Sequence, residues 1–134
     1  MGATTLPKTA LAAFFTDQAR DAACAVLRAA GVMNVLPATT SPEPDEAHAA
    51  SADVIVTDWP PAGLDLETML RDLRAKFGHG GAQTPVVMLS HRAGRADVDA
   101  ARRAGVDAYV VCPVSSALLK HRLARLAPHG SPLG

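Results

Sequence analysis

Residues 52–58 have the sequence ADVIVTD, in which four β-branched side chains follow one another between two aspartates. A short run of this kind, without alternating polar residues, is typical of a strand that is buried on both faces of a sheet. The run stops at Trp59, Pro60 and Pro61, so the strand is expected to end there. The sequence therefore predicts that Asp58 stands at the carboxyl end of an inner strand.

Segments on either side of this strand alternate between strand-like and helix-like patterns. Apolar residues recur at helical spacing between Thr16 and Gly31 and again between Asp65 and Gly78. Strands that alternate with helices favour a parallel sheet with right-handed crossovers and helices on both faces. The predicted strands are 9–15, 32–38, 52–58, 85–90 and 108–112, the predicted helices 16–31, 65–78, 98–105 and 115–126, and the predicted loops 39–51 and 78–84.

The size and composition of the chain are those of one compact domain. It has 134 residues, of which 49% are hydrophobic, with 13 basic and 13 acidic side chains. We expect a single domain whose core spans residues 8–127, followed by a disordered tail at 128–134. No long uncharged run predicts a membrane span, and the N-terminus does not resemble a secretory signal. We therefore expect a cytoplasmic protein in which Cys24 and Cys112 are free thiols.

The charges are distributed unevenly along the chain. Residues 1–70 carry three basic and nine acidic side chains, whereas residues 71–134 carry ten and four. The C-terminal half therefore offers a basic surface for an acidic partner or a phosphate backbone. Because few aromatic residues are interleaved with these charges, protein binding is favoured over nucleic-acid binding. The basic residues concerned are Arg92, Arg95, Arg102, Arg103, Lys120, Arg122 and Arg125.

Several distinctive residues are predicted to follow the strands. Ligands of an open α/β sheet bind beyond the carboxyl ends of the strands, where Phe14, Phe15, Asp58, Ser90 and Cys112 are expected. Together with the segments VIVTDWPPAGLDL, TPVVMLS and GVDAYVVCP, this set resembles the receiver domain of response regulators in two-component signalling. The resemblance covers roughly residues 8–127. It implies a flavodoxin-like fold, which is a doubly wound parallel sheet with the strand order 2-1-3-4-5.

The resemblance also implies roles for individual residues. Asp58 falls at the position of the phospho-accepting aspartate, Ser90 at that of a hydroxyl that contacts the phosphoryl group, and Tyr109 at that of the switch aromatic. Pro113 matches a proline that in this family usually follows a cis peptide bond. The seven basic residues named above lie on the segments that form the partner and dimer face of receivers. These segments are the predicted helix 98–105 with the residues before it, the strand 108–112 and the helix 115–126.

Three substitutions depart from the family pattern. Phe14 and Phe15 stand where receivers have two acidic residues that hold Mg²⁺ together with the acceptor aspartate, and Cys112 replaces a lysine that pairs with the acyl phosphate. Phenyl rings cannot bind Mg²⁺, which takes oxygen ligands, and a thiol is neutral near neutral pH unless its pKa is depressed. Strand alternation predicts one phenyl ring inside the core and the other partly exposed.

We therefore expect a stand-alone degenerate receiver, or pseudo-receiver, which binds signalling proteins without phosphorylation, needs no cofactor and is not an enzyme. Its expected partners are a histidine kinase, a phosphotransfer protein or another regulator, with a homodimer through the same face as a further option. Asp58 is then a structural carboxylate bonded to turn amides. The alternative is a phosphorylatable single-domain response regulator, in which Asp58 accepts phosphate from such a kinase or phosphotransfer protein and Asp17 joins Asp58 in binding Mg²⁺.

Further hypotheses concern the same crevice. One is a sensor of a small molecule, which would bind beside Phe14 and Phe15, or of a nucleic acid, which would bind the basic helices. The opposing interpretation is that these rings fill the core or the place of the metal. Another is catalysis by Cys112 with His91 as its base, although the sequence offers no third residue to orient the base. Cys24 is expected to pack inside the domain.

Overall fold

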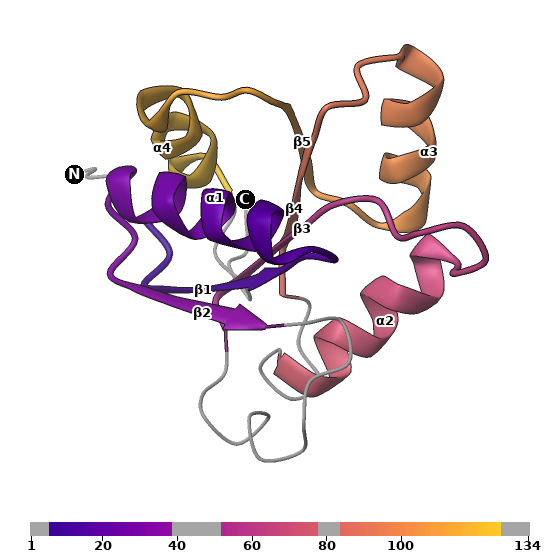
Figure 1. Ribbon diagram of the computed structural model, residues 1–134, viewed down its shortest axis with the longest axis horizontal. Helices are drawn as coiled ribbons and strands as arrows, with labels where there is room; N and C mark the ends of the chain where they lie inside the picture. Colours follow the sequence, from indigo (N-terminus) through magenta and orange to yellow (C-terminus); the bar gives the residue numbers. More distant parts are fainter. Residues whose placement is uncertain (1–5, 39–51, 78–83, 127–134) are drawn as a thin grey trace, which may run out of the picture.

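The computed structural model describes residues 6–38, 52–77 and 84–126, which form five strands and four helices (Figure 1). The predicted loop at 39–51, most of the predicted loop at 78–84 and the predicted tail at 128–134 lie outside the described residues. In chain order the elements are β1 (Thr9–Ala13), α1 (Asp17–Ala29), β2 (Asn34–Ala38), β3 (Val54–Thr57), α2 (Leu66–Phe77), β4 (Val86–Ser90), α3 (Arg95–Ala104), β5 (Ala108–Val111) and α4 (Ser116–Ala124).

The strands form one parallel sheet in the order β2-β1-β3-β4-β5, which confirms the predicted flavodoxin-like topology. Every residue of β3 and β4 is buried, because these two inner strands are covered by helices on both sides. Pro37 lies in β2 at the edge of the sheet, where a missing backbone donor can be tolerated. From β1 the chain adds β2 on one side and β3, β4 and β5 on the other, so the strand order reverses between β1 and β3.

All five strands are shorter than the sequence predicts, and two of them end before candidate site residues. The strand predicted at 9–15 ends at Ala13, and the strand predicted at 52–58 ends at Thr57. Ala13 lies opposite Ala38 of β2 and Thr57 of β3, and these are the last described pairs of the ladder. Since hydrogen bonds from neighbouring strands define a strand, the residues beyond these pairs lie in loops above the sheet. Phe14, Phe15 and Asp58 are among them.

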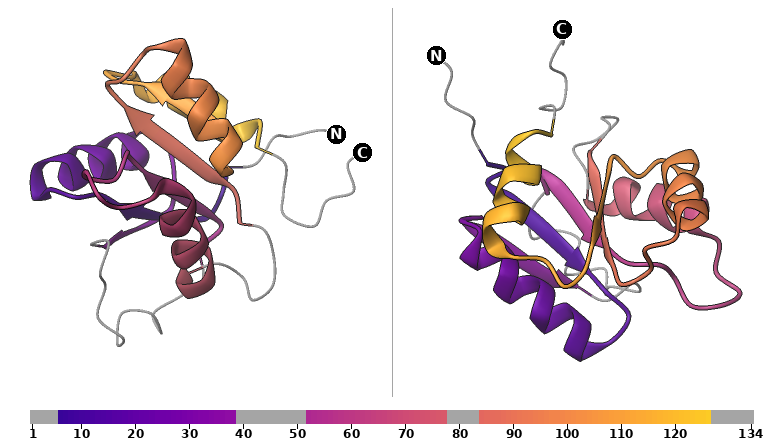
Figure 2. Two further views of the ribbon diagram at one scale, coloured as in Figure 1. Left: turned by 90° about the vertical axis from the view of Figure 1, so that its right-hand side faces the viewer. Right: turned by 90° about the horizontal axis from the view of Figure 1, so that it is seen from above.

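Helices cover both faces of the sheet, so the core has two layers (Figure 2). On one face, α1 and α4 lie side by side and contribute Leu27 and Leu119 to a cluster with alternate strand residues such as Val56. On the other face, α2 and α3 contribute Leu70 and Ala101 to a second cluster. None of the helices in the described part of the chain is long and apolar enough to cross a lipid bilayer.

Polar side chains and glycines fix the ends of several helices. Thr16 accepts a hydrogen bond from the amide of Ala19 at the start of α1, and Ser115 accepts one from Leu118 at the start of α4. Asp65 accepts bonds from the amide and the hydroxyl of Thr68 before α2, which lowers the pKa of its carboxyl group. Gly105 has a φ of 115° after α3, a conformation that a residue with a side chain rarely adopts.

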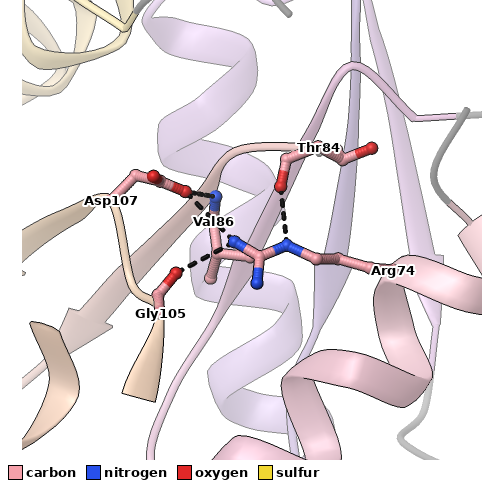
Figure 3. Close-up of polar contacts among 5 residues, drawn as sticks. All are labelled: Arg74, Thr84, Val86, Gly105 and Asp107. Carbon is pink, nitrogen blue, oxygen red and sulfur yellow. Dashed lines mark hydrogen bonds and ion pairs between the residues drawn. The ribbon is translucent and has the colours of Figure 1, made fainter. Parts of the chain in front are cut away.

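An arginine joins three elements at the amino ends of β4 and β5 (Figure 3). Arg74 of α2 donates from Nε to the carbonyl of Thr84 (2.9 Å) and from Nη2 to the carbonyl of Gly105 (2.9 Å). The same Nη2 lies 3.2 Å from Oδ2 of Asp107, which also accepts a hydrogen bond of 2.8 Å from the amide of Val86. We call this group the Arg74 clasp; it lies at the amino ends of the strands, whereas Asp58 lies beyond a carboxyl end.

Candidate functional site

Residues that follow four of the strands line one cavity beyond the carboxyl ends of the sheet. Phe14 follows β1, Asp58 follows β3, His91 follows β4 and Cys112 follows β5. The cavity has a volume of about 290 Å³, and its lining is mostly apolar. It lies between these strand ends and α1, which is the place where open α/β sheets bind their ligands. Its lining residues are Phe14, Ala19, Ala22, Ala23, Val26, Asp58, Leu89, His91, Cys112, Pro113 and Val114.

Asp58 is half-buried and is held by the loop that begins with it. Its Oδ1 accepts a hydrogen bond of 2.6 Å from the amide of Trp59. The preceding Thr57 is fully buried, and its hydroxyl donates to the carbonyl of Ala13 at 2.7 Å. This bond ties the end of β3 to the end of β1. The carboxylate is therefore positioned at the point where the strand order reverses.

The two phenyl rings lie in different layers of the core. Phe14 is 5% exposed and packs with the cluster under α1 and α4. Phe15 is partly buried and packs against the cluster under α2 and α3. One ring is thus buried and the other partly exposed, as the sequence predicts, although both residues lie beyond the end of β1. Phe14 also lines the cavity, whereas Phe15 does not.

The Mg²⁺ site that the receiver resemblance implies does not fit these residues. Phe14 and Phe15 supply no oxygen, and Asp17, the remaining candidate, is 87% exposed and forms an ion pair with Arg20 at 3.2 Å. Asp17 does not line the cavity that contains Asp58. Among the described residues, no group of three or more histidine, cysteine or acidic side chains is arranged to hold a metal ion. Asp17 instead serves as a negative charge in the first turn of α1.

Cys112 is half-buried in the cavity, and its thiol is not activated. Burial raises its pKa above the ordinary value, and the negative charge of Asp58 raises it further. In the described part of the chain, no hydrogen bond joins His91 to Cys112, and His91 is exposed. A nucleophilic cysteine needs a lowered pKa or a base bonded to it, and among the described residues this thiol has neither. The peptide bond between Cys112 and Pro113 is cis, the conformation that the resemblance implies for Pro113.

A connected group of contacts joins the three positions that correspond to receiver landmarks. The indole N–H of Trp59 donates to the hydroxyl of Tyr109 (2.9 Å), and this hydroxyl donates to the carbonyl of Arg92 (2.8 Å). The amide of Arg92 donates to Oγ of Ser90 (3.1 Å), and its guanidinium lies 5.1 Å from the centroid of the Trp59 ring. Tyr109 is 5% exposed. With the bond from Trp59 to Asp58, these five residues form what we call the Trp59 network.

Sequence patterns assigned no role to Trp59 and placed Arg92 only on the basic surface. The sequence predicts Trp59 only as the end of a strand, although a tryptophan directly after a strand-end carboxylate marks it as a neighbour of the site. The contact with Tyr109 joins residues 50 positions apart, so it depends on the order of the strands. Arg92 is exposed, but one face of its guanidinium is stacked on Trp59.

The remaining basic residues lie on α3, on α4 or just after α4. Arg95, Arg102, Arg103, Lys120 and Arg125 are exposed. Arg122 is half-buried, because its guanidinium donates to the backbone carbonyl of Tyr109 at 3.3 Å. Two large apolar side chains, Val111 of β5 and Leu118 of α4, are exposed on the same two elements. We call the surface of α3, β5 and α4, together with Arg92, the basic face.

Known proteins resemble this chain in sequence. No family model matches it. The chemotaxis protein CheY1 of Helicobacter pylori is 36% identical over 99 residues, which cover 69% of this chain and 75% of that protein. The chemotaxis protein CheY of Pseudomonas aeruginosa is 33% identical over 81 residues, and CheY-3 of Vibrio cholerae is 34% identical over 76 residues. The matches cover 62% of the Pseudomonas protein and 55% of the Vibrio protein, less than two thirds of each.

Solved structures resemble it in fold. The receiver domain of a sensor histidine kinase from Pseudomonas aeruginosa, which has a magnesium ion coordinated in its active-site cleft, superposes with a TM-score of 0.63 over 88% of this chain and 95% of its own, at 22% identity. The chemotaxis protein CheY4 of Vibrio cholerae superposes with a TM-score of 0.64 over 86% and 97%, also at 22% identity. The fold, the strand order and the sequence relatives agree. The chain belongs to the CheY-like family of response-regulator receiver domains in two-component signalling.

Proposed function

We propose that this chain is a degenerate receiver that acts through protein–protein contact and does not use a Mg²⁺-dependent phosphorylation cycle. In this proposal its domain spans residues 8–127, it works in the cytoplasm and it has no catalytic turnover of its own. The observation that carries the proposal is the cavity beside Asp58, where Phe14 and Cys112 stand in place of charged residues. Asp58 is then a structural carboxylate that holds the amide of Trp59.

The chemistry of phosphoryl transfer supports this interpretation. Attack on a dianionic phosphoryl group requires cationic groups that offset the charge accumulating in the transition state. Among the described residues, no lysine or arginine lines the cavity, and its only basic group is the imidazole of His91. The Cys112 thiol is neutral near neutral pH, because its pKa is raised. An aspartyl phosphate at Asp58 would therefore lie against mostly apolar side chains, without lysine or arginine counterions in the described lining.

The Trp59 network supports regulation without phosphate. Tyr109 and Ser90 are buried, and each makes hydrogen bonds that need no phosphoryl group. The hydroxyl of Tyr109 is already satisfied as both donor and acceptor. A partner that binds the basic face can bias this element directly, because Arg92 and Arg122 connect the face to Tyr109. We propose an acidic surface of a kinase, a phosphotransfer protein or another regulator as that partner.

Beryllofluoride, which mimics an aspartyl phosphate, tests the independence from phosphorylation. Trp59 is the only tryptophan of the sequence and follows Asp58 directly, so its fluorescence reports on the site. We expect that Mg²⁺ with beryllofluoride changes neither this fluorescence nor the proton–nitrogen NMR spectrum in a manner that depends on Asp58. The Asp58→Ala variant is the reference. A saturable change that requires both Mg²⁺ and Asp58 would overturn the proposal and establish the phosphorylatable alternative.

Affinity capture tests the proposed surface. Proteins captured by the wild type are compared in yield with those captured by Asp58→Ala and by the double variant Arg102→Glu, Arg103→Glu. We expect Asp58→Ala to retain its partners within about twofold and the charge reversal to lose them. Arg28→Glu, an exposed change on α1 outside the basic face, is the matched control. Loss of the partners in Asp58→Ala with retention in the charge reversal would contradict the proposed mode of binding.

A further inference from the structure

The cavity beside Asp58 has the volume and lining of a small-molecule site. Its volume of about 290 Å³ is at the lower end of the range for such sites. It opens beyond the carboxyl ends of the strands at the reversal of the strand order, where flavodoxin-like sheets take their ligands.

Small residues on α1 create the room. Ala19, Ala22 and Ala23 line the cavity on the side of the helix, and Phe14 lines it on the side of the sheet. Ala22 is exposed, whereas Phe14 is 5% exposed and anchored in the core. A ligand here would meet the methyl groups of the alanines and the side chain of Phe14. The complementary group is an apolar one about the size of a single aromatic ring.

Among the described residues, Asp58 is the only acidic one that lines the cavity. Its Oδ1 accepts the amide of Trp59, and no other hydrogen bond or ion pair in the described part of the chain reaches its carboxylate. One carboxylate can accept several hydrogen bonds, so Asp58 can accept a further one from a donor inside the cavity. The charge also acts within the cavity, since Asp58 contributes to the raised pKa of Cys112. The polar group that complements it is a cation with N–H donors.

We propose that this cavity binds a small amphipathic amine, whose ammonium group pairs with Asp58 and whose apolar body packs between Phe14 and the alanines of α1. An anionic ligand would face Asp58 with no lysine or arginine in the described lining, and a divalent metal would lack further oxygen ligands there. A neutral apolar molecule would cover the half-buried carboxylate without offering it a hydrogen-bond donor. Binding of an amine does not require the proposed protein–protein contact. If both occur, the amine would be a ligand that regulates the contact.

Phenethylamine is the probe, because it carries one aromatic ring and one primary ammonium. We expect a saturable titration in proton–nitrogen NMR spectra, with shifts at Ala22, Val26 and Cys112 and a dissociation constant on the order of 1 mM, as for a ligand of so few atoms. Phenethyl alcohol, which has nearly the same shape without the charge, is expected to bind at least about tenfold more weakly. Trp59 fluorescence provides a second readout.

Two variants with matched controls decide whether this cavity is the site. Asp58→Asn removes the charge, and Ala22→Leu fills the space from the exposed side of α1; each should weaken phenethylamine about tenfold or more. Asp99→Asn and Ala25→Leu change exposed residues outside the cavity and should leave the affinity unchanged. The NMR spectrum without ligand reports whether each variant is folded. Absence of saturable shifts, equal binding of the alcohol, or equal binding by Ala22→Leu would overturn the proposal.

Discussion

Trp59 contacts two partners through different parts of its side chain. Its indole N–H donates to the hydroxyl of Tyr109, and the face of its ring accepts the guanidinium of Arg92. A buried hydrogen bond contributes modestly to stability, but a partner left unsatisfied after a substitution is costly. Trp59 therefore stabilises the buried position of Tyr109 in a way that a phenylalanine could reproduce only in part.

The contribution of this bond can be measured with a double-mutant cycle. Trp59→Phe and Tyr109→Phe should each lower the free energy of unfolding by about 0.5–1.5 kcal/mol, because each removes the bond between the two side chains. In the double variant the losses should fall short of additivity by about 1 kcal/mol. Urea unfolding followed by far-ultraviolet circular dichroism measures all four proteins. Additive losses would show that the two residues contribute independently.

The thiol of Cys112 provides a pH-dependent test of the cavity. Burial and the charge of Asp58 both raise its pKa, so the thiolate forms only at higher pH than in an ordinary cysteine. In a Cys24→Ser background, the rate of alkylation by iodoacetamide should therefore begin to rise only at a higher pH than for an ordinary cysteine. Asp58→Asn removes the smaller of the two causes, and the rate profile should move to lower pH. An unchanged profile, or a move to higher pH, would show that Asp58 does not act on Cys112.

Individual residues differ in how far the sequence predicts their surroundings. The positions of Phe14, Asp58 and Cys112 after strand ends follow from local patterns. The different burial of Phe14 and Phe15 agrees with the alternation expected of a strand, although β1 ends at Ala13. The bond between Trp59 and Tyr109 does not follow, because the predicted strand order places β3 and β5 on either side of β4 but does not determine which of their side chains meet. The sequence also does not predict that Asp17 stays away from the cavity. Its carboxylate forms an ion pair with Arg20 of the same helix instead.

At the scale of the elements, a helix is connected to neighbouring loops by hydrogen bonds from one side chain to backbone carbonyls. The Arg74 clasp joins α2 to the residue before Pro85 and to the turn after α3, and its two shortest contacts are with the carbonyls of Thr84 and Gly105. Sequence patterns predict the helix and both neighbouring strands but cannot predict which carbonyls an arginine reaches. A carbonyl group is present at every position, so only the folded arrangement distinguishes these two.

Removing the clasp should destabilise the packing of α2 against β4 and β5. Arg74→Met keeps an unbranched side chain of similar length, loses all three contacts and leaves two carbonyls to find other partners. We expect a loss of about 2 kcal/mol in the free energy of unfolding, measured by urea denaturation. Arg71→Met, an exposed change on the same helix, should stay within about 0.5 kcal/mol of the wild type. Equal effects of the two substitutions would contradict a role for the clasp.

At the scale of the whole molecule, net neutrality conceals a strong separation of charge. From residue 92 to residue 125 the chain has seven basic and three acidic side chains, and most of the basic ones are exposed on the basic face. A twofold dimer through this face would place the same residues of two copies against each other. Like charges would then meet, which favours an acidic partner over a second copy.

Sedimentation velocity at different salt concentrations distinguishes these two occupants. If repulsion between basic faces dominates, the chain should be monomeric at low salt, and any self-association should increase as salt screens the charges. If Asp97 and Asp99 of one copy instead paired with arginines of the other, association would be strongest at low salt and would weaken as salt is added. The double variant Arg102→Glu, Arg103→Glu distinguishes the two possibilities further. Removing basic charge should increase self-association if the basic faces repel each other, and should abolish it if aspartates of one copy pair with arginines of the other. We expect the first behaviour, since the exposed arginines and lysine of the face outnumber its aspartates.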